Sequence, residues 1–293
     1  MDTTEASLSD QGVRNPVHFP LTVASVSFLL LHAGALGVLL VPFRWELGLF
    51  AVGSYLLRMF AITAGYHRYF SHRTFKTTRL FQFLLAFLAQ TTGQKGVLWW
   101  AAHHRHHHGH ADLPSDVHSP LRHGFFWSHV GWVLADTYDH FDPKLVPDLY
   151  KFPELRFLDR YHWISPWALG ALCFQVGRWT GWGGWASLLW GFVLPTVALF
   201  HATFLINSMA HLWGTRRFPT KDGSRNNAFL AVLTLGEGWH NNHHAFPGSV
   251  RQGMLWWELD ITFYVLKLLS WVGLVRDLRG FPASALERSK DAS

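Results

Sequence analysis

Apolar residues are concentrated in four long runs along the chain. The runs cover residues 19–41, 47–66, 161–177 and 179–215, and Arg58 is the only Lys, Arg, Asp or Glu inside them. Because roughly 20 predominantly apolar residues are needed to cross the hydrocarbon core of a bilayer, the pattern predicts an all-α integral membrane protein with four transmembrane helices. Turn-like segments at 42–45 and 178–184 separate the runs in pairs, so we expect two helical hairpins, the second with helices near 163–178 and 184–206.

A fifth apolar run, at residues 80–94, ends in the polar segment 91–96. We expect it to lie at the membrane surface or against the bundle, because an even number of crossings agrees with the distribution of basic residues. Of 25 Lys and Arg, 11 fall in 67–160 and 10 in 207–293, whereas only Arg44 and Arg178 lie in the opposite loops. The positive-inside rule then places both termini and both long polar segments on the cytoplasmic side. We expect residues 1–293 to form one domain, with disordered tails at about 1–15 and 283–293.

The composition agrees with a membrane protein and excludes several other classes. Charged residues make up 15% of the chain, against about 25% in soluble globular proteins. The single cysteine, Cys173, excludes an internal disulfide framework, a Cys-ligated zinc module and a Cys-bound iron–sulfur cluster. The excess of basic residues is explained by anionic lipid, and no nucleic-acid-binding module is present. The unusual feature is histidine, since 20 histidines outnumber the 19 Asp and Glu.

The histidines gather in four groups, each at or just beyond the end of an apolar segment. The groups fall at 67–72, 103–108, 207–211 and 240–244. The pattern His-x-x-His-His occurs twice, beginning at His104 and at His240. On a helix the side chains at i+3 and i+4 lie on either side of the first, so each triplet suits two neighbouring metal ions better than one. His67 and His72 are five residues apart, and they can converge only if their helix ends or bends between them.

Histidine in this number predicts a metal centre, since imidazole suits zinc, copper, iron and nickel. The His-Glu-x-x-His helix of zinc proteases is absent, and the groups hold almost no Glu, unlike soluble di-iron carboxylate enzymes. A two-iron site built from histidine, placed at a membrane surface for oxygen chemistry on a lipid, accounts for the surplus. We interpret the other 11 histidines as structural, packing or surface groups, namely His18, His32, His103, His106, His110, His118, His123, His129, His140, His162 and His201.

The chain resembles the membrane fatty-acid desaturases of the stearoyl-CoA (Δ9) type. The resemblance covers roughly residues 50–275. It rests on the order and spacing of the motifs ITAGYHRYFSHRTFK at 62–76, WAAHHRHHHGHADLPSDVHSP at 100–120, GFFWSHVGWVL at 124–134, NSMAHLWGTRRF at 207–218 and GEGWHNNHHAFPGSVR at 236–251. The family implies a helical cap on the cytoplasmic side of the membrane that carries a histidine-rich di-iron site.

The resemblance also implies roles for individual residues. One iron is expected to be held by His67, His72, His108 and His244, with a water bound to Asn207, and the other by His104, His107, His211, His240 and His243. Asp112, Asp116 and Glu237 are candidates to accept the second ring N–H of these ligands. The aromatic residues nearest the histidines, which are candidates for the wall of a substrate tunnel, are Trp99, Trp100, Phe125, Phe126 and Trp127.

The implied reaction places a cis double bond in a long-chain saturated acyl group. It consumes O2 at two irons that cycle between Fe2+ and Fe3+, and it takes two further electrons from a separate donor. No haem-attachment or dinucleotide-binding motif is present, so the expected donor is an acidic ferredoxin or a cytochrome b5-like protein with its reductase, docked on the basic face.

Two departures from the acyl-CoA enzymes leave the acyl carrier open. Ala102 and His103 replace the Arg-Asp pair that precedes the second histidine motif in the animal enzymes, and the acidic segment 135–139 stands where they have a basic pair. The resemblance puts CoA first, with acyl carrier protein and phospholipid as alternatives. Two other functions are considered, a related di-iron lipid hydroxylase and a metal transporter. A transporter would be expected to carry ionisable groups near the middle of its spans, whereas the four histidine groups of this chain lie beyond the predicted spans.

Overall fold

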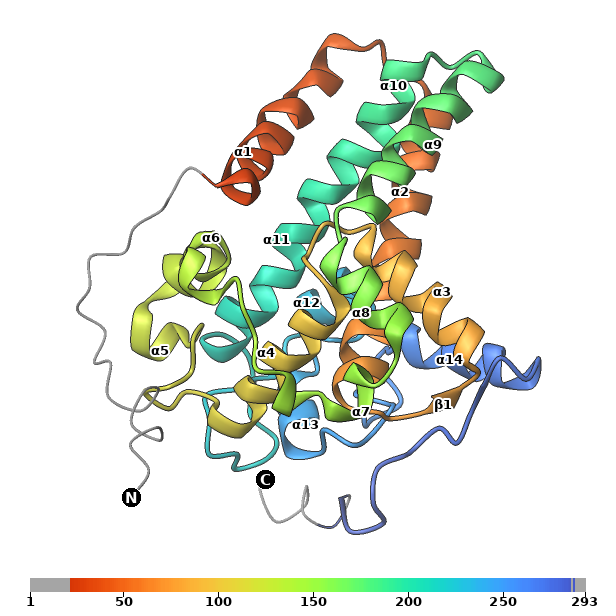
Figure 1. The fold of residues 1–293 in the computed structure, drawn as a ribbon. Coiled ribbons are helices and arrows are strands. Elements are labelled where there is room, and N and C mark those ends of the chain that lie inside the picture. The colour runs from red at the N-terminus through yellow and green to blue at the C-terminus, as the bar shows by residue number, and fades with distance from the viewer. Residues whose placement is uncertain (1–21, 286, 288–293) are drawn as a thin grey trace.

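The computed structural model describes residues 22–285 and residue 287, and it is mostly helical with almost no sheet. Figure 1 shows long helices leaning out of a body of shorter helices and loops. The long segments are α1 (Val23–Ala35) with η1 (Leu36–Leu40), α2 (Trp45–Phe60) with η2 (Ala61–Ser71), α9 (Ile164–Thr180), and α10 (Gly184–Leu188) with η6 (Leu189–Val193), α11 (Leu194–Ser208) and η7 (Met209–His211).

The body is assembled from the other elements. They are β1 (Lys76–Thr77), α3 (Arg79–Gln90), α4 (Val97–His110), α5 (Pro120–His123), η3 (Trp127–Gly131), α6 (Trp132–Leu134), η4 (Asp136–Tyr138), η5 (Pro143–Leu145), α7 (Pro147–Tyr150), α8 (Pro153–Arg160), α12 (Ala228–Leu233), α13 (His240–Ala245), α14 (Ile261–Trp271) and β2 (Val275–Arg276). The two short strands pair antiparallel.

Two continuous helices among the described residues are long and apolar enough to cross a membrane. They are Trp45–Ser71, with 27 residues, and Gly184–His211, with 28 residues. These correspond to the second and fourth predicted spans. The first predicted span is a shorter apolar helix, Ala24–Leu40, and its first residues, 19–21, lie outside the described part. The third predicted span is α9, with 17 residues. The fifth apolar run forms α3, a shorter apolar helix of 12 residues whose Leu85, Ala86 and Ala89 lie in the core of the body.

Glycines allow the long helices to approach one another closely. Gly181 and Gly183, with φ of 74° and 94°, form the turn between α9 and α10, and this turn falls inside the predicted loop. A Cβ atom on Gly177 would lie 2.3 Å from the carbonyl oxygen of Gly183, and one on Gly191 would lie 2.1 Å from a ring carbon of Phe50. The helix contacts therefore require the absence of a side chain at these positions.

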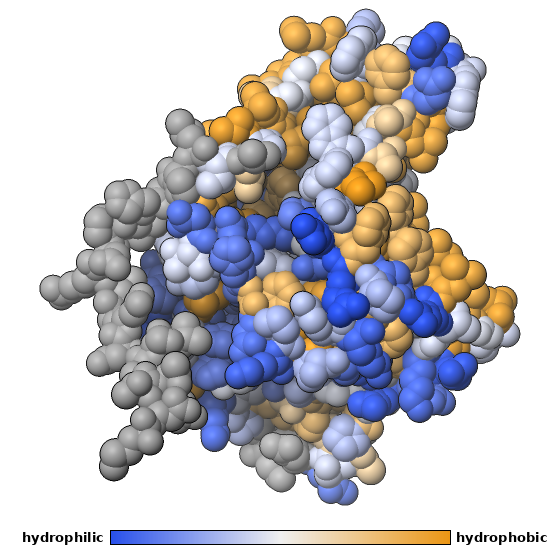
Figure 2. All heavy atoms as spheres, viewed as in Figure 1, coloured by the Kyte–Doolittle hydropathy of each residue, from blue (hydrophilic) through white to orange (hydrophobic). Residues whose placement is uncertain are grey.

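The outer surface of the long helices is apolar, as Figure 2 shows for the end of the molecule that they form. The most exposed of these side chains include Leu36, Leu39, Leu40, Phe43, Trp45, Leu49 and Trp185. An apolar surface of this extent is unfavourable in water and suits the hydrocarbon interior of a bilayer.

The core of the body lies where η2, α3, α4 and α8 meet. It is filled by buried side chains that include Tyr66, Phe70, Phe75, Leu85, Leu98, Leu149 and Leu155. The carboxylate of Asp159 accepts from the backbone N–H groups of Leu98 and Trp99 at 2.8 and 3.0 Å, which caps the first turn of α4. The core thereby fixes the direction of α4, the helix that carries the second histidine group.

The two predicted disordered tails lie mostly outside the described residues. Within the C-terminal one, Ala285 is described and fully buried against Phe218, Phe246 and Met254, so the chain packs against the body at least this far.

Candidate metal centre

Nine histidines from four segments converge in the body of the molecule, and they are the nine that the sequence singled out. Their ring nitrogens form two clusters, and within each cluster the ligand atoms lie within 4.8 Å of one another. Cluster I contains His67, His72, His104, His108 and His243, and cluster II contains His107, His211, His240 and His244.

The Nε2 atoms of neighbouring histidines face one another. In cluster I, Nε2 of His243 lies 2.9 Å from that of His67 and 2.9 Å from that of His108, and the Nε2 atoms of His72 and His104 are 2.8 Å apart. In cluster II, the Nε2 atoms of His211 and His240 are 3.1 Å apart.

The structure divides the histidines differently from the sequence prediction, which grouped His244 with His67 and placed His104 and His243 with His107. In α4 and α13 alike, the residues at i and i+4 share one cluster and the residue at i+3 joins the other. Helical geometry explains this, because the i+4 side chain is rotated by only about 40° from the first, whereas the i+3 side chain lies about 60° away on the opposite side. Each triplet serves both clusters, as its divergence indicated.

The helix carrying His67 winds as a π-helix over its last eleven residues, Ala61–Ser71. The backbone N–H of His72 donates to the carbonyl of His67 at 3.2 Å, which is the i→i+5 bond of a π turn. This wider turn brings the two rings to a centroid separation of 4.9 Å. The sequence argument required an interruption between these residues, and the structure supplies it as π geometry together with the end of the helix at His72.

Four carboxylates accept hydrogen bonds from the outward-facing Nδ1 atoms. Asp116 accepts from His107 at 3.1 Å and Asp112 from His211 at 2.8 Å, and Glu237 contacts Nδ1 of His67. The fourth, Asp222, accepts from His244 at 3.0 Å. Sequence reasoning pointed to the first three acids but missed Asp222, because it lies in a loop 22 residues before its partner with no pattern to mark it. Such contacts fix the tautomer and orientation of an imidazole ligand.

Glu237 belongs to a buried network that sequence reasoning also missed. The guanidinium of Arg68, 1% exposed, donates to Glu237 at 2.9 Å and forms an ion pair with Asp260 at 2.9 Å. The side-chain amide of Gln252 donates to Glu237 at 2.8 Å. Arg68 stands next to His67 in the chain, so the network holds that end of η2 in place.

Burial and mutual charge set the protonation of these groups. Burial lowers the pKa of the His72, His104, His108, His240 and His243 imidazoles well below the ordinary range, and neighbouring imidazoles lower it further. These rings are therefore neutral near pH 7, the form in which imidazole binds a metal.

The carboxylates are shifted in the direction that keeps them charged. Burial opposes their ionisation, but nearby His211 and hydrogen bonds lower the pKa of Asp112 to about 2. His67 and Arg68 lower the pKa of Glu237 to about 2 against the same effect of burial. The negative charges therefore remain beside the outward faces of the imidazoles.

A small cavity of about 40 Å³ lies against both clusters. It is lined by Met59, Ile62, Thr63, His67, Trp100, His104, His107, Thr203, Ile206, Asn207, Thr234, Glu237 and His240. Asn207 thus lines the same cavity as His67 and His104 of cluster I and His107 and His240 of cluster II. The lining also contains apolar side chains of α2, η2 and α11, which belong to the second and fourth predicted spans.

Of the five aromatic tunnel candidates, only Trp100 lines this cavity, and its ring stacks on Tyr66 and His104. Trp99 faces away and donates to the carbonyl of Tyr138 at 2.7 Å. Phe125 and Phe126 are 45% and 68% exposed, and the indole of Trp127 donates to Val117. Nearness in sequence to a histidine motif therefore does not place a side chain in the cavity, because successive residues of a helix such as α4 face different neighbours.

His18, one of the histidines set aside by sequence, lies outside the described residues, and none of the others belongs to cluster I or cluster II. His106 and His110 stack on each other, and His103 approaches the carbonyl of His140 at 3.2 Å. His118 nevertheless lies next to cluster II, since its ring lies 4.4 Å from that of His107 and beside Asp116. In a separate chain of contacts, His201 lies 3.0 Å from both His32 and His129.

The arrangement fits metal ions. Nε2 of His244 is buried without a hydrogen-bond partner although its Nδ1 is held by Asp222. A neutral imidazole carries one ring N–H, so rings whose Nδ1 atoms donate to carboxylates present unprotonated Nε2 atoms to the centre of their cluster. Several lone pairs facing one another are repulsive unless a cation lies between them.

Comparisons with known proteins show the family of the chain. The sequence profile of the fatty acid desaturase family matches residues 19–270. The chain is 37% identical over 264 residues to the sn-1 stearoyl-lipid 9-desaturase of Anabaena variabilis, an alignment that covers 88% of this chain and 93% of that protein. It is 36% identical to the sn-2 palmitoyl-lipid 9-desaturase of Nostoc sp. (strain 36), in an alignment that covers 88% of this chain and 90% of that protein. It is also 39% identical to the icosanoyl-CoA 5-desaturase of Limnanthes douglasii, covering 87% and 71%.

Proposed function

The chain belongs to the fatty acid desaturase family, and we propose that it introduces a cis double bond at the ninth carbon of a saturated acyl chain carried by a membrane lipid. The observation that carries the proposal is the pair of buried and half-buried histidine clusters, of five and four imidazoles, beside a cavity whose apolar lining is Met59, Ile62, Trp100 and Ile206. Two hydrogens leave the acyl chain, O2 is the oxidant, and two electrons and two protons from outside complete its reduction to two waters.

The nine histidines are proposed to hold two irons, with cluster I around one and cluster II around the other. When bound, the two irons supply the oxidising power that breaks unactivated C–H bonds with O2. Asn207 is proposed to hold a water beside the clusters, because it lines the same cavity as histidines of both clusters. A ligand set of nine nitrogens exceeds the three or so protein ligands of a hydrolytic zinc site, which favours oxygen chemistry over hydrolysis.

The protein's own groups orient the site and keep water out. Asp112, Asp116, Asp222 and Glu237 hold their histidines as Nδ1–H tautomers, so that each Nε2 faces its cluster. The cavity of about 40 Å³ between α2 and α11 is proposed to receive the reacting carbons of the acyl chain, with Trp100 packing beside them. An apolar wall fixes the methylene chain against the clusters and excludes water during the reaction.

A lipid-bound chain is favoured over the CoA ester, the first choice from sequence resemblance. The acidic segment 135–139 is held beside α4, since Trp99 donates to the carbonyl of Tyr138. Of its two acids, Asp139 pairs with Lys95, whereas Asp136 is exposed with no cation beside it among the described residues. Carboxylates here repel the phosphates of CoA, and two of the relatives named above act on lipid-bound chains.

We further propose that the protein spans the membrane four times with the clusters and both termini on the cytoplasmic side. The asymmetry of basic residues supports this orientation. The electron donor is proposed to be an acidic ferredoxin or cytochrome b5-like protein that docks on the basic face, so the rate of reduction is expected to fall as ionic strength rises.

The deciding experiment gives the purified, iron-loaded enzyme two labelled substrates in parallel, stearoyl-CoA and a stearoyl phospholipid, with a ferredoxin and its reductase. The proposal predicts that the phospholipid is converted to a product that has lost two hydrogen atoms and carries the double bond at carbon 9. Conversion of stearoyl-CoA alone would contradict the proposed carrier. A product that has gained oxygen would identify a lipid hydroxylase instead.

A further inference from the structure

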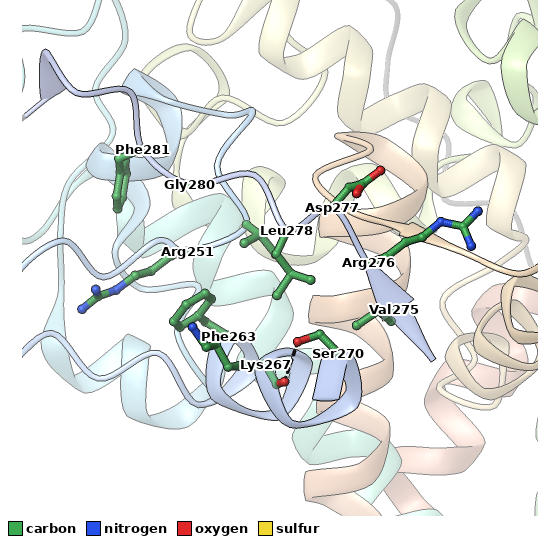
Figure 3. A pocket seen from close by; sticks show the side chains of 11 residues that line it. Arg251, Phe263, Lys267, Ser270, Val275, Arg276, Asp277, Leu278, Gly280 and Phe281 are labelled. Carbon is green, nitrogen blue, oxygen red and sulfur yellow. Dashed lines mark hydrogen bonds between the residues drawn. The ribbon is translucent and has the colours of Figure 1, made fainter. Parts of the chain in front are cut away.

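A second, larger pocket of about 570 Å³ opens beside α14 and is separate from the histidine clusters. Figure 3 shows its lining, which comes from the loop after α13, from α14 and from the segment through β2. The residues are Val250, Arg251, Phe263, Lys267, Ser270, Val275, Arg276, Asp277, Leu278, Gly280 and Phe281.

The cations of this pocket lack counter-charges. The guanidinium of Arg251 lies over the ring of Phe263 at 5.6 Å, and its Nε is buried without a hydrogen-bond partner. Lys267 is exposed. In the part of the chain that the structure describes, neither cation makes an ion pair. The carboxylate of Asp277 lines the pocket but is paired with Lys76 at 2.9 Å. The pocket therefore has an excess of positive charge.

The surroundings add to this excess. Arg276 adds one cation, since it makes no ion pair among the described residues; it stands directly opposite Lys76 in the β1–β2 pair, and Lys76 is itself paired with Asp277. Figure 3 shows Arg276 pointing away from Phe263, outward from the pocket. An anion that approaches the pocket is thus attracted by a wider basic surface before it meets Arg251 and Lys267.

Beside these cations the surface is apolar. On α14 and the turn after it, Leu268, Trp271 and Val272 are 54%, 72% and 70% exposed, and Leu80 of α3 is 69% exposed. Figure 2 shows hydrophobic side chains gathered on the side of the molecule where α3 and α14 lie. Lys267 lies next to the exposed Leu268 and Trp271 on α14, and exposed Leu and Trp beside a basic residue are typical of a helix that lies in the membrane interface. An acidic protein partner would have to cover these apolar side chains, whereas a lipid solvates them.

We propose that this pocket binds the phosphate group of an anionic membrane phospholipid, whose acyl chains lie along the exposed apolar side chains of α14. Arg251 and Lys267 contact the phosphate oxygens, and Phe263 and Leu278 pack against the glycerol end of the lipid. The site is distinct from the cavity proposed for the reacting acyl chain, and its occupant is a lipid that anchors α14 rather than a substrate.

The test measures binding to the full-length, iron-loaded protein in non-ionic detergent. The midpoint of thermal unfolding is followed during titration with dihexanoyl phosphatidylglycerol, dihexanoyl phosphatidylcholine or inorganic phosphate, because a ligand of the folded state raises this midpoint. Lys267→Gln removes one cation of the pocket, and Lys144→Gln removes an exposed lysine outside it as the matched control. Phosphatidylglycerol is expected to raise the midpoint more than phosphatidylcholine. The apparent Kd for phosphatidylglycerol should rise about fivefold in Lys267→Gln, because a basic residue contributes about 1 kcal/mol to binding of an anionic lipid. It should stay unchanged in Lys144→Gln.

Three results would overturn the proposal. Equal affinities of Lys267→Gln and Lys144→Gln for phosphatidylglycerol would show that the pocket does not bind this lipid. A full shift from inorganic phosphate alone would identify a site for a free anion. Slower reduction of Lys267→Gln by a ferredoxin, with lipid affinity unchanged, would identify the surface as the docking site of the electron donor. Each of these is separable from desaturase activity, since product formation is not the measured quantity.

Discussion

The substitution Asp112→Asn tests whether the carboxylates beside the clusters tune metal binding one cluster at a time. Asp112 accepts three hydrogen bonds, from Nδ1 of His211 at 2.8 Å, from the backbone N–H of Gly223 at 2.7 Å and from the hydroxyl of Ser119. Its backbone φ of 58° is in the left-handed region, which Asn also adopts. The substitution therefore removes a negative charge with little change of shape.

The magnitude follows from these contacts. The amide oxygen of Asn can take the place of Oδ2 and keep the bonds from His211 and Gly223, and its NH2 group can donate to Ser119. Hydrogen bonds to a charged acceptor contribute about 1.5–3 kcal/mol and those to a neutral one about 1 kcal/mol. The loss at His211 is thus about 0.5 to 2 kcal/mol, which predicts about 2- to 30-fold weaker binding of the metal in cluster II.

The assay follows release of iron from the purified protein to a chelator. Asp112→Asn is expected to release one of two irons at lower chelator concentration than the parent protein, because only cluster II contains His211. Asp136→Asn, an exposed acid in a neighbouring loop, is the matched control and should behave as the parent. Release of both irons together would contradict the division into two clusters, and equal behaviour of the two variants would refute the role of Asp112.

Three further predictions concern the ligands, the cavity and the fold. His243→Ala removes an imidazole from cluster I and should abolish desaturation in a product assay. Full activity of this variant would show that His243 is not a required metal ligand. Ile62→Phe fills part of the cavity and should lower kcat/KM for an 18-carbon chain at least about tenfold with iron content unchanged, whereas Ile62→Val should keep both. Gly191→Ala forces a Cβ against Phe50, while Gly53→Ala meets nothing within 4 Å. Only the former should lower the unfolding midpoint, by several degrees for a loss of about 1–3 kcal/mol, and equal midpoints would refute the close packing.

Much of the helical arrangement could be predicted from sequence because it depends on local patterns. The turn at Gly181 and Gly183 lies in the predicted loop, and α9 begins one residue after the predicted helix. Two of the four expected spans meet the length of a membrane-crossing helix. The helices of the other two are shorter than their apolar runs, because the apolar residues continue past the end of each helix into its caps and turns.

The candidate site could be predicted as a set of residues but not as a geometry. The histidine motifs identified all nine members of the two clusters. The prediction split each triplet at i+4, whereas the angular positions on a helix separate i+3. Asp222 and Arg68 contribute through contacts that join segments 22 and 169 residues apart in the chain, and such long-range pairings leave no local pattern. Trp100 was indistinguishable in sequence from Trp99, which faces another neighbour.

The metal content of the purified full-length protein is the most direct test of the proposed two-iron centre. Expression in iron-replete medium, followed by elemental analysis against the protein concentration, is expected to give about two irons per chain, since the two clusters offer five and four imidazoles. A chain that holds two equivalents of zinc and no iron under these conditions, or that holds one metal ion or none, would contradict the account.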